Sequence, residues 1–357
     1  MGGEGYFQAM PSAAPLILPY AGVSPKLASP IAHAGLGAAV LGRVTLGRNP
    51  WLGPLSVLRA DGHYVTAGDD FHLGARSTLH IAHAIFPCIV GDRVTVGENA
   101  CVHACTVGSD VVIDDGSVIL DGAIVEDNVV FEAGSTVFPN KRVAGGFLYA
   151  GSPAKPLRAL ESGEAGNRRA ALIERNKARQ EPARPTLAIA NGSDVHDSVF
   201  IAATATLKGR IIAAQSSSIW YANNFDAGAA VISIGARTNI QDNTAIRCTG
   251  AGVTIGPDTT VGHNVTIRDS VIGSHTLIGI GSTVEEGTTV EDRVLLAAAA
   301  RTAPGQRLES GWLYGGSPAR QLSRLDEGKL ALIEEIVAQY CEYAQDFKAL
   351  ERAFAAA

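Results

Sequence analysis

The stretch LHIAHAIFPCIVGDRVTVGENACVHACTV, residues 79–107, decides the fold. Within it an aliphatic residue followed by Gly or a small polar residue returns about every six positions, and a later part of the chain repeats this step. The positions include Val90, Val96, Val102, Val107, Ile255, Val261 and Ile267. A six-residue period fits neither one face of a helix nor a simple alternating strand. It predicts a triangular prism, in which each side is a short strand and stacked coils bury a column of Val, Ile and Leu.

A longer repeat divides the chain into two copies of one domain. Three segments of the first half return in the second: GGFLYAGSPAKPLRAL (145–160) as SGWLYGGSPARQLSRL (310–325), VGENACVHACTVGS (96–109) as VGHNVTIRDSVIGS (261–274), and GARSTL (74–79) as GARTNI (235–240). We therefore predict a mainly β protein with two tandem parallel β-helices, each followed by a helical segment. The predicted boundaries are 11–165 for the first β-helix domain, 166–186 for a helix and Pro-containing linker, 187–325 for the second β-helix domain, and 326–357 for a C-terminal helix.

The two helical segments have apolar residues at helical spacing. Residues 167–180 are polar with a narrow apolar stripe, and residues 330–354 carry a wider one made of Leu332, Ile333, Ile336, Val337, Tyr340 and Tyr343. Spacings of three and four residues place such side chains on one face of a helix. We expect the last helix to pack along the outside of a prism or across a subunit boundary.

The composition excludes several classes of partner. Hydrophobic residues make up 46% of the chain and aromatic residues only 6%, so the core should be aliphatic. A net charge of −6 without blocks of Lys or Arg argues against nucleic acid, because phosphate binding needs clustered positive charge. No apolar run approaches the length of a membrane span, and no signal peptide is recognised. We predict a cytoplasmic protein with a small-molecule substrate, no membrane partner and five reduced cysteines.

Several motifs in the right order resemble a known family. They are VLRAD (57–61), VHAC (102–105), NIQD (239–242), VGH (261–263) and the closing LYAGSPAK and LYGGSPAR. The chain is similar to the gamma-class carbonic anhydrase branch of the left-handed parallel β-helix proteins, in both halves. This resemblance implies a homotrimer, with zinc bound at the subunit interface by three histidines from two neighbouring subunits.

Neither half keeps all three histidines that the resemblance implies. By the repeat register, the three ligand positions hold Phe86, Glu98 and His103 in the first half, and Arg247, His263 and Arg268 in the second. His103 and His263 are complementary, but a closed three-fold ring cannot alternate two kinds of domain. We therefore expect a trimer of first halves stacked on a trimer of second halves.

The first half offers replacement ligands. His80 falls where the resemblance implies a pocket glutamine, matched by Gln241 in the other copy. Glu98 could give a carboxylate to a site with His103 and with His80 or His83. Histidine and carboxylate with open positions are a usable set for zinc or another divalent metal. In the alternative interpretation, His80 and His83 are surface or interface histidines, and Glu98 is a solvated turn residue.

Further residues complete the predicted pocket. Arg59 and Asp61 match the arginine and aspartate that the resemblance implies, although an intersubunit ion pair would also explain them. Together with His80 and His103 they are the predicted catalytic residues. Residues 62–73 are read as a loop about six residues longer than its counterpart, and this loop would place His63, Tyr64 and His72 at the substrate rim, where Phe86 would stack over His103. In the second half Gln241, Arg247, His263 and Arg268 are read as the remnant of a site.

Three functions remain open. The first is a metal-dependent lyase or hydrolase that acts on a small acyl or carbonyl substrate, with weak carbonic anhydrase activity because Phe86 and Glu98 replace two ligands. The second is a transferase that binds acyl-CoA and uses a histidine as general base. The third is a non-catalytic assembly protein.

Overall fold

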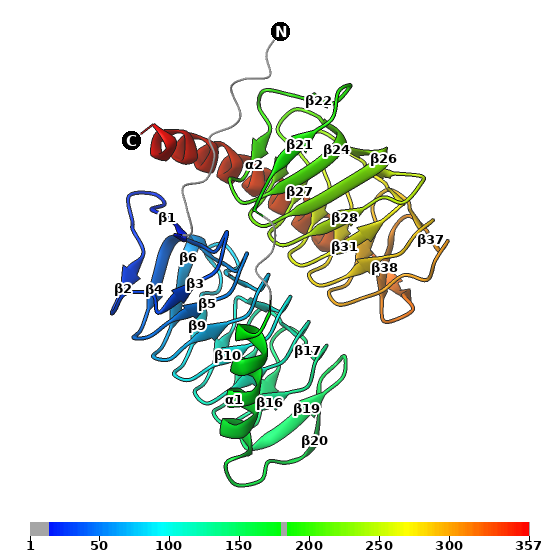
Figure 1. Ribbon diagram of the computed structural model, residues 1–357. Coiled ribbons are helices and arrows are strands. Elements are labelled where there is room, and N and C mark those ends of the chain that lie inside the picture. The colour runs from blue at the N-terminus through cyan, green and yellow to red at the C-terminus, as the bar shows by residue number, and fades with distance from the viewer. Residues whose placement is uncertain (1–13, 180–183, 357) are drawn as a thin grey trace. The chain divides into compact units, whose positions relative to one another are not determined.

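The computed structural model describes residues 14–179 and 184–356, which form two compact units, 15–183 and 184–357. Each unit is a parallel β-helix of stacked coils followed by one helix (Figure 1), so the predicted fold is confirmed. Within the described part of the chain, neither helix has the length and apolar character needed to cross a membrane.

The first unit, from Pro15 to Ala183, contains two sheets and helix α1 (Glu164–Lys177). One sheet has the order β17 (Thr136–Val137), β14 (Val118–Ile119), β11 (Cys101–His103), β8 (Thr78–His80), β6 (Val57–Ala67), β9 (Cys88–Val90), β12 (Thr106–Val107), β15 (Ile124–Val125), β18 (Arg142–Val143), and β1 (Leu16–Leu18), β2 (Lys26–Leu27) and β4 (Ala39–Leu46) join it at β4. The other has the order β20 (Lys155–Ala159), β19 (Phe147–Ala150), β16 (Val130–Phe131), β13 (Val112–Ile113), β10 (Thr95–Val96), β7 (His72–Leu73), β5 (Trp51–Leu52), β3 (His33–Ala34).

The second unit repeats this plan and ends in helix α2 (Glu327–Ala355). One sheet has the order β34 (Thr283–Val284), β31 (Thr266–Arg268), β28 (Ala245–Arg247), β26 (Asn224–Ile234), β29 (Val253–Ile255), β32 (Val271–Ile272), β35 (Thr289–Val290), β37 (Arg307–Leu308), with β21 (Leu187–Ile189), β22 (Asp194–Val195) and β24 (Thr206–Ala213) joined at β24. The other has the order β23 (Phe200–Ile201), β25 (Ser218–Ile219), β27 (Asn239–Ile240), β30 (Thr260–Val261), β33 (Leu277–Ile278), β36 (Leu295–Leu296), β38 (Trp312–Gly315), β39 (Arg320–Arg324).

The long strand β6 explains how two sheets make three sides. Its first residues pair with β8, through Val57 and Thr78, and its last residues pair with β9, through Val65 and Cys88. The first sheet therefore turns a corner at β6 and supplies two sides of the prism. We call the side formed by β8, β11, β14 and β17 the histidine side, because it carries His80 and His103.

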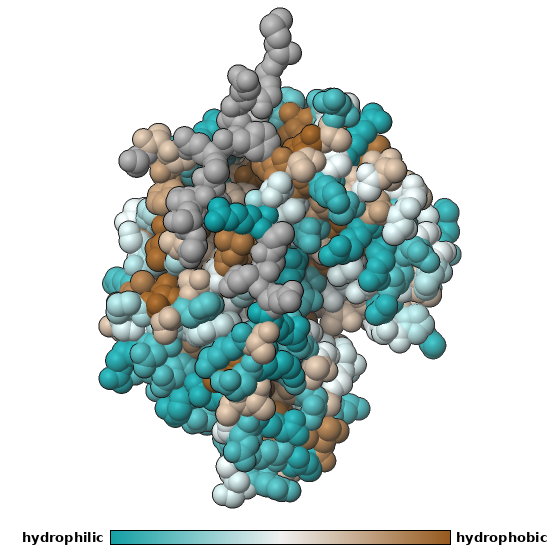
Figure 2. All heavy atoms as spheres, viewed as in Figure 1, coloured by the Kyte–Doolittle hydropathy of each residue, from teal (hydrophilic) through white to brown (hydrophobic). Residues whose placement is uncertain are grey.

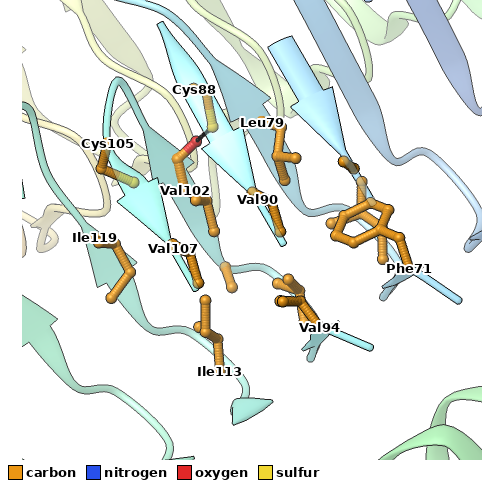
Figure 3. Packing of buried hydrophobic residues seen from close by; sticks show 14 of the residues in the cluster. Phe71, Leu79, Cys88, Val90, Val94, Val102, Cys105, Val107, Ile113 and Ile119 are labelled. Atoms are coloured by element: carbon orange, nitrogen blue, oxygen red, sulfur yellow. Dashed lines mark hydrogen bonds between the residues drawn. The ribbon is translucent and has the colours of Figure 1, made fainter. Parts of the chain in front are cut away.

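The inward column is aliphatic, as the six-residue period predicts. Figure 3 shows Leu79, Val90, Val102, Val107 and Ile119 turned toward the interior of the first unit. All of them are buried. Because successive residues of a strand point to opposite faces, the residue that follows each inward position lies on the outside of the prism.

Each helix covers the remaining side of its own prism. Helix α1 contacts β10 and β13, and its visible outer surface is largely hydrophilic (Figure 2). Helix α2 contacts β23, β25, β27 and β30, where Phe347 and Tyr340 meet Trp220 edge to face with ring centroids 5.4 and 5.2 Å apart. Leu332, predicted on the apolar stripe, is 46% exposed.

His72 lies in an aromatic stack on the side that α1 covers. Its ring stacks on Trp51 with centroids 4.0 Å apart. Burial, together with the positive charges of Arg169 and Lys177, lowers the pKa of His72 to about 3. A depressed histidine pKa in the folded state means that the unfolded state binds the proton more tightly, so stability is complete above about pH 6.5 and is lost as the pH falls toward 3.

We therefore expect His72→Phe to keep the stack and to flatten the acid side of the stability profile. Hydrogen exchange of the segment that contains β7 would be compared at pH 7 and pH 4.5 in the full chain. The wild type should lose protection at the lower pH and the variant should lose much less. His196→Phe, at an exposed histidine of the second unit, is the matched control. An equal acid loss in His72→Phe and wild type would contradict the prediction.

Strand pairing corrects the register that relates the two halves. His72 pairs with Thr95, and Asn239 pairs with Thr260, so His72 corresponds to Asn239. Likewise Thr78 pairs with Val57 and Ala245 with Asn224. These pairs make His80 the counterpart of Arg247, and Gly74 the counterpart of Gln241. The predicted match of His80 with Gln241 and of Phe86 with Arg247 is wrong.

The predicted six-residue loop is wrong for the same reason. Strand β6 begins at Val57 and β7 at His72, and the same separation lies between the first residues of β26 and β27, Asn224 and Asn239. Residues 62–73 are thus the end of β6, a corner and β7 rather than an added loop. The first unit is slightly longer than the second, but between β8 and β9, when the first residues of these strands are compared with those of β28 and β29.

Candidate metal centre

Two buried histidines meet on the histidine side of the first unit. His80 ends β8 and His103 ends β11, and the two residues are register partners in adjacent coils. Each follows a residue of the core, Leu79 or Val102, that points into the prism (Figure 3). Because side chains alternate along a strand, both imidazoles lie on the outer face. Nδ1 of His80 lies 3.2 Å from Nε2 of His103. We call these two residues the dihistidine pair.

The outer nitrogen of each imidazole faces a carboxylate. Nε2 of His80 lies 3.2 Å from Oδ1 of Asp61, and Nδ1 of His103 lies 2.5 Å from Oδ1 of Asp121. Both oxygens are acceptors, so in its neutral form each histidine donates its outer N–H to a carboxylate and turns an unprotonated nitrogen toward the other ring. The pair is thereby held in the arrangement that metal-binding histidines have, with a carboxylate behind each ring.

The spacing of the facing nitrogens fits a divalent ion. A zinc ion about 2.0–2.1 Å from each of two nitrogens at a tetrahedral angle would hold them about 3.3–3.4 Å apart. The observed 3.2 Å is close to that value. Two lone pairs directed at one another also repel, and a cation between them removes the repulsion. The donor set therefore fits a metal ion such as zinc.

A buried ion pair supports the dihistidine pair. Arg59 donates to Asp61, and the side chains of both residues are fully buried. Burial alone would raise the pKa of Asp61, but the charges of Arg59 and His80 outweigh it and lower that pKa well below its usual range. Asp61 is thus a carboxylate that fixes the orientation of His80. The predicted intersubunit ion pair lies within one unit.

Asp121 is a site residue that the sequence reasoning missed. It follows β14 and sits one coil below His103. Burial would raise the pKa of its carboxyl group, but the charge and the hydrogen bond of His103 outweigh this effect and lower the pKa. The sequence signal for it is the strand register: Val102 pairs with Ile119 in the next coil, so Asp121, in the corner two residues after Ile119, lies one coil from His103.

The other proposed ligands of the first unit lie elsewhere. His83 is exposed in the segment between β8 and β9. Glu98 sits at the corner after β10 and forms an ion pair with Arg179, just beyond α1. Burial raises the pKa of Glu98, although Arg179 opposes the shift.

The residues predicted at the substrate rim divide into two groups. His63 and Tyr64 follow Asp61 within β6, with ring centroids 4.7 Å apart. Phe86 stands on the segment before β9, and its ring tip would be 3.4 Å from a Cβ placed on Gly122, next to Asp121. His63 and Tyr64 are thus close to Asp61 along the chain, and Phe86 is close in space to Gly122, the neighbour of Asp121. His72 lies apart from them, on the side that α1 covers.

In the second unit charged residues replace the dihistidine pair. Arg247 and Arg268 are register partners at the two positions, and Arg268 donates to Glu285 at 2.6 Å. Nδ1 of His263 lies 3.2 Å from Oδ2 of Asp242, and both side chains are buried. Gln241 donates to Asn239 at 3.2 Å. Two arginines oppose cation binding at these positions, since like charges repel at short range.

Comparisons with known proteins agree with this architecture. The bacterial transferase hexapeptide family (six repeats) matches residues 104–139, and the hexapeptide repeat of succinyl-transferase matches residues 270–299. The mitochondrial gamma carbonic anhydrase 2 of Arabidopsis thaliana is 35% identical over 134 residues, which are 36% of this chain and 48% of that protein. Protein YrdA of Escherichia coli is 39% identical over 133 residues, which cover 72% of its length. The chain belongs to the gamma carbonic anhydrase-like hexapeptide-repeat proteins.

Membership of this family does not by itself assign an activity. The chain spans about half the length of the Arabidopsis gamma carbonic anhydrases that it matches. Among solved structures, a putative acetyltransferase of Bacillus cereus is 27% identical, with a TM-score of 0.44, and the match covers 45% of this chain and 96% of that one.

Proposed function

We propose that the first unit is a metal-dependent hydratase or hydrolase that acts on a small acyl or carbonyl substrate. The observation that carries the proposal is the dihistidine pair, whose facing nitrogens lie 3.2 Å apart while each outer nitrogen contacts a carboxylate. A divalent ion held there would lower the pKa of a water molecule toward neutrality and polarise a carbonyl group.

The chain's own residues would position the reactants. Asp61 and Asp121 keep both imidazoles in the tautomer that leaves Nδ1 of His80 and Nε2 of His103 as ligand atoms. The guanidinium of Arg59 neutralises Asp61, which prevents that carboxylate from leaving its place behind His80. His63 and Tyr64 stand beside Asp61 in β6 and are proposed to contact the substrate. Three sites in a homotrimer remain our proposal for the assembly.

A catalytic zinc site takes three protein ligands and keeps one position open, so one ligand is still required. We propose that a neighbouring copy supplies it through the turn before β11 or through the matching turn before β31. This turn position holds Glu98 in the first unit and His263 in the second. His263 is the better candidate, because Glu98 already forms an ion pair with Arg179 and because the corrected register gives the two units complementary parts of one histidine set. This proposal replaces the expected stack of two separate trimers, since a second unit of a neighbouring copy would then contribute to the site.

The experiment is metal analysis of the purified full chain. We expect close to one zinc or other divalent ion per chain in the wild type, a large loss in His263→Gln, and little change in Glu98→Gln. Metal lost from Glu98→Gln alone would assign the third ligand to Glu98 of a neighbouring first unit. A wild-type protein that binds no divalent ion, and that acyl-CoA protects against thermal unfolding, would replace the proposal by an acyltransferase.

A further inference from the structure

A turn next to the dihistidine pair exposes a large apolar side chain. Residues 81–87, IAHAIFP, connect β8 to β9 and begin directly after His80. Ile85 in this turn is 70% exposed, the highest value for a large hydrophobic residue in the described part of the chain. A single exposed apolar side chain is common on protein surfaces. This one is distinguished by the shape of its turn and by its position, and we call residues 82–86 the apolar turn.

Backbone hydrogen bonds hold the apolar turn in one shape. The N–H of Ala82 donates to the carbonyl of Phe86 at 3.1 Å, and the N–H of Ile85 donates to the carbonyl of Ala82 at 2.8 Å. His83 has a φ of +43°, in the left-handed region that a residue with a Cβ seldom occupies. The ring tip of Phe86 would be 3.4 Å from a Cβ placed on Gly122, so the turn also rests on a neighbouring corner. A closed turn of this kind loses little conformational entropy when a partner covers it.

The second unit closes the corresponding segment with polar contacts instead. Its counterpart is the shorter segment 248–252, CTGAG, between β28 and β29. The carboxylate of Asp269 accepts hydrogen bonds from the backbone N–H groups of Thr249, Gly250 and Gly252, at 2.8, 3.2 and 2.8 Å. The segment contains no large apolar residue. At this corner of the prism, an exposed apolar side chain therefore accompanies the dihistidine pair and is replaced where the pair is replaced.

The incomplete metal site indicates what covers the apolar turn. The dihistidine pair provides two nitrogens, whereas a catalytic zinc site takes three protein ligands. A neighbouring copy that supplies the third must bring an atom to about 2 Å from the ion, so its surface has to lie against the outer face of His80 and His103.

The apolar turn lies within reach of such a contact. Ile85 comes five positions after His80, and five extended residues span at most about 18 Å. The turn folds back on itself through the contact between Ala82 and Phe86, which shortens this span. A standard interface of about 800 Å² per partner has a radius of about 16 Å. A neighbour seated on the dihistidine pair would therefore also meet Ile85.

We propose that the apolar turn belongs to the interface between copies of this chain, and that Ile85 docks against the neighbouring copy that completes the metal site. This rests on the proposed function, since the missing third ligand is what seats a neighbour there. The partner is a second copy of the chain, because the site lacks a protein ligand rather than a substrate. Burial of Ile85 removes its apolar surface from water and strengthens the contact.

The test compares the assembly of full-chain variants by sedimentation velocity over a range of protein concentrations, with and without zinc. We expect Ile85→Ala to raise the dissociation constant of the assembly at least about tenfold, because three carbon atoms leave a buried contact. Leu157→Ala removes a leucine of β20 that is 60% exposed, and it should assemble as the wild type does. Equal dissociation constants for Ile85→Ala and wild type would overturn the proposal, as would a wild type that stays a single chain at every concentration.

Metal content separates the docking role of Ile85 from the proposed function. At a protein concentration where the wild type is assembled and Ile85→Ala is not, the zinc bound per chain should fall in the variant. It should return when the variant is concentrated until it assembles. If neither protein binds zinc but Ile85→Ala still dissociates more readily, the proposed function fails and the docking role stands. If both proteins bind zinc and assemble equally, the proposed function stands and the docking role fails.

Discussion

Replacing His103 by Ala is expected to leave the first unit folded, to remove its metal and to reduce any metal-dependent turnover to the metal-free background. His103 contributes a nitrogen 3.2 Å from that of His80, and its loss leaves two protein ligands in a site that needs three. Without the ion, the pKa of the reacting water returns from about 7 toward 15.7, so little hydroxide is available at neutral pH. Elemental analysis and turnover with acyl esters would measure both effects.

Asp121→Asn is expected to weaken metal binding only in part, in contrast to the complete loss expected for His103→Ala. The amide is nearly isosteric with the carboxylate that contacts His103 but carries no charge, and loss of such a partner behind a ligand weakens metal binding about 10- to 100-fold. Metal should therefore be retained at high zinc concentration and lost on dialysis. His196→Ala, at an exposed histidine of the second unit, should behave as wild type. Full turnover in His103→Ala would exclude every function in which this histidine takes part.

The fold could be predicted from the sequence because its signal repeats many times. Inward residues such as Val96, Val102 and Val107 recur once per side of the prism, and each occurrence supports the others. The same holds for the helices, whose apolar stripes need only local spacing. Repetition makes such a fold evident before any contact between distant residues is known.

The same repetition explains why the site was only partly predicted. A hexapeptide array resembles itself after a shift of six residues, so the motif GAR at 74–76 matched GAR at 235–237, which lies on the neighbouring side of the prism. A true insertion of about six residues would move every later strand to another side of the prism. Strand pairing shows no such insertion between β6 and β7. His80 therefore occupies the ligand position that the motif match assigns to Phe86.

Residues that meet across coils were the hardest to find from the chain. Asp121 reaches His103 from the corner after β14, two residues beyond Ile119, the strand partner of Val102. Such contacts depend on corner residues, which the aliphatic period does not predict. Arg59 and Asp61, by contrast, alternate with one residue between them on one face of the same strand, so their pairing was open to prediction from spacing alone.

Replacing Arg59 by Met is expected to have the largest effect on stability among the site residues. The substitution leaves the fully buried carboxylate of Asp61 without its cation, and removing one partner of a buried ion pair costs about 3–5 kcal/mol of unfolding free energy. That cost is a large part of the stability of a typical domain. Urea unfolding, combined with hydrogen exchange of β6, would measure it in the full chain.

The double variant Arg59→Met with Asp61→Leu separates the ion pair from packing. With both charges gone no uncompensated charge remains buried, so most of the lost stability should return, because apolar residues of similar volume can replace a buried pair at little cost. His80 then loses the carboxylate behind its ring, and metal affinity should stay about 10- to 100-fold low even though the fold recovers. Recovery of metal binding together with stability would show that Asp61 does not orient His80, and a loss below about 1 kcal/mol in Arg59→Met would show that water reaches the pair.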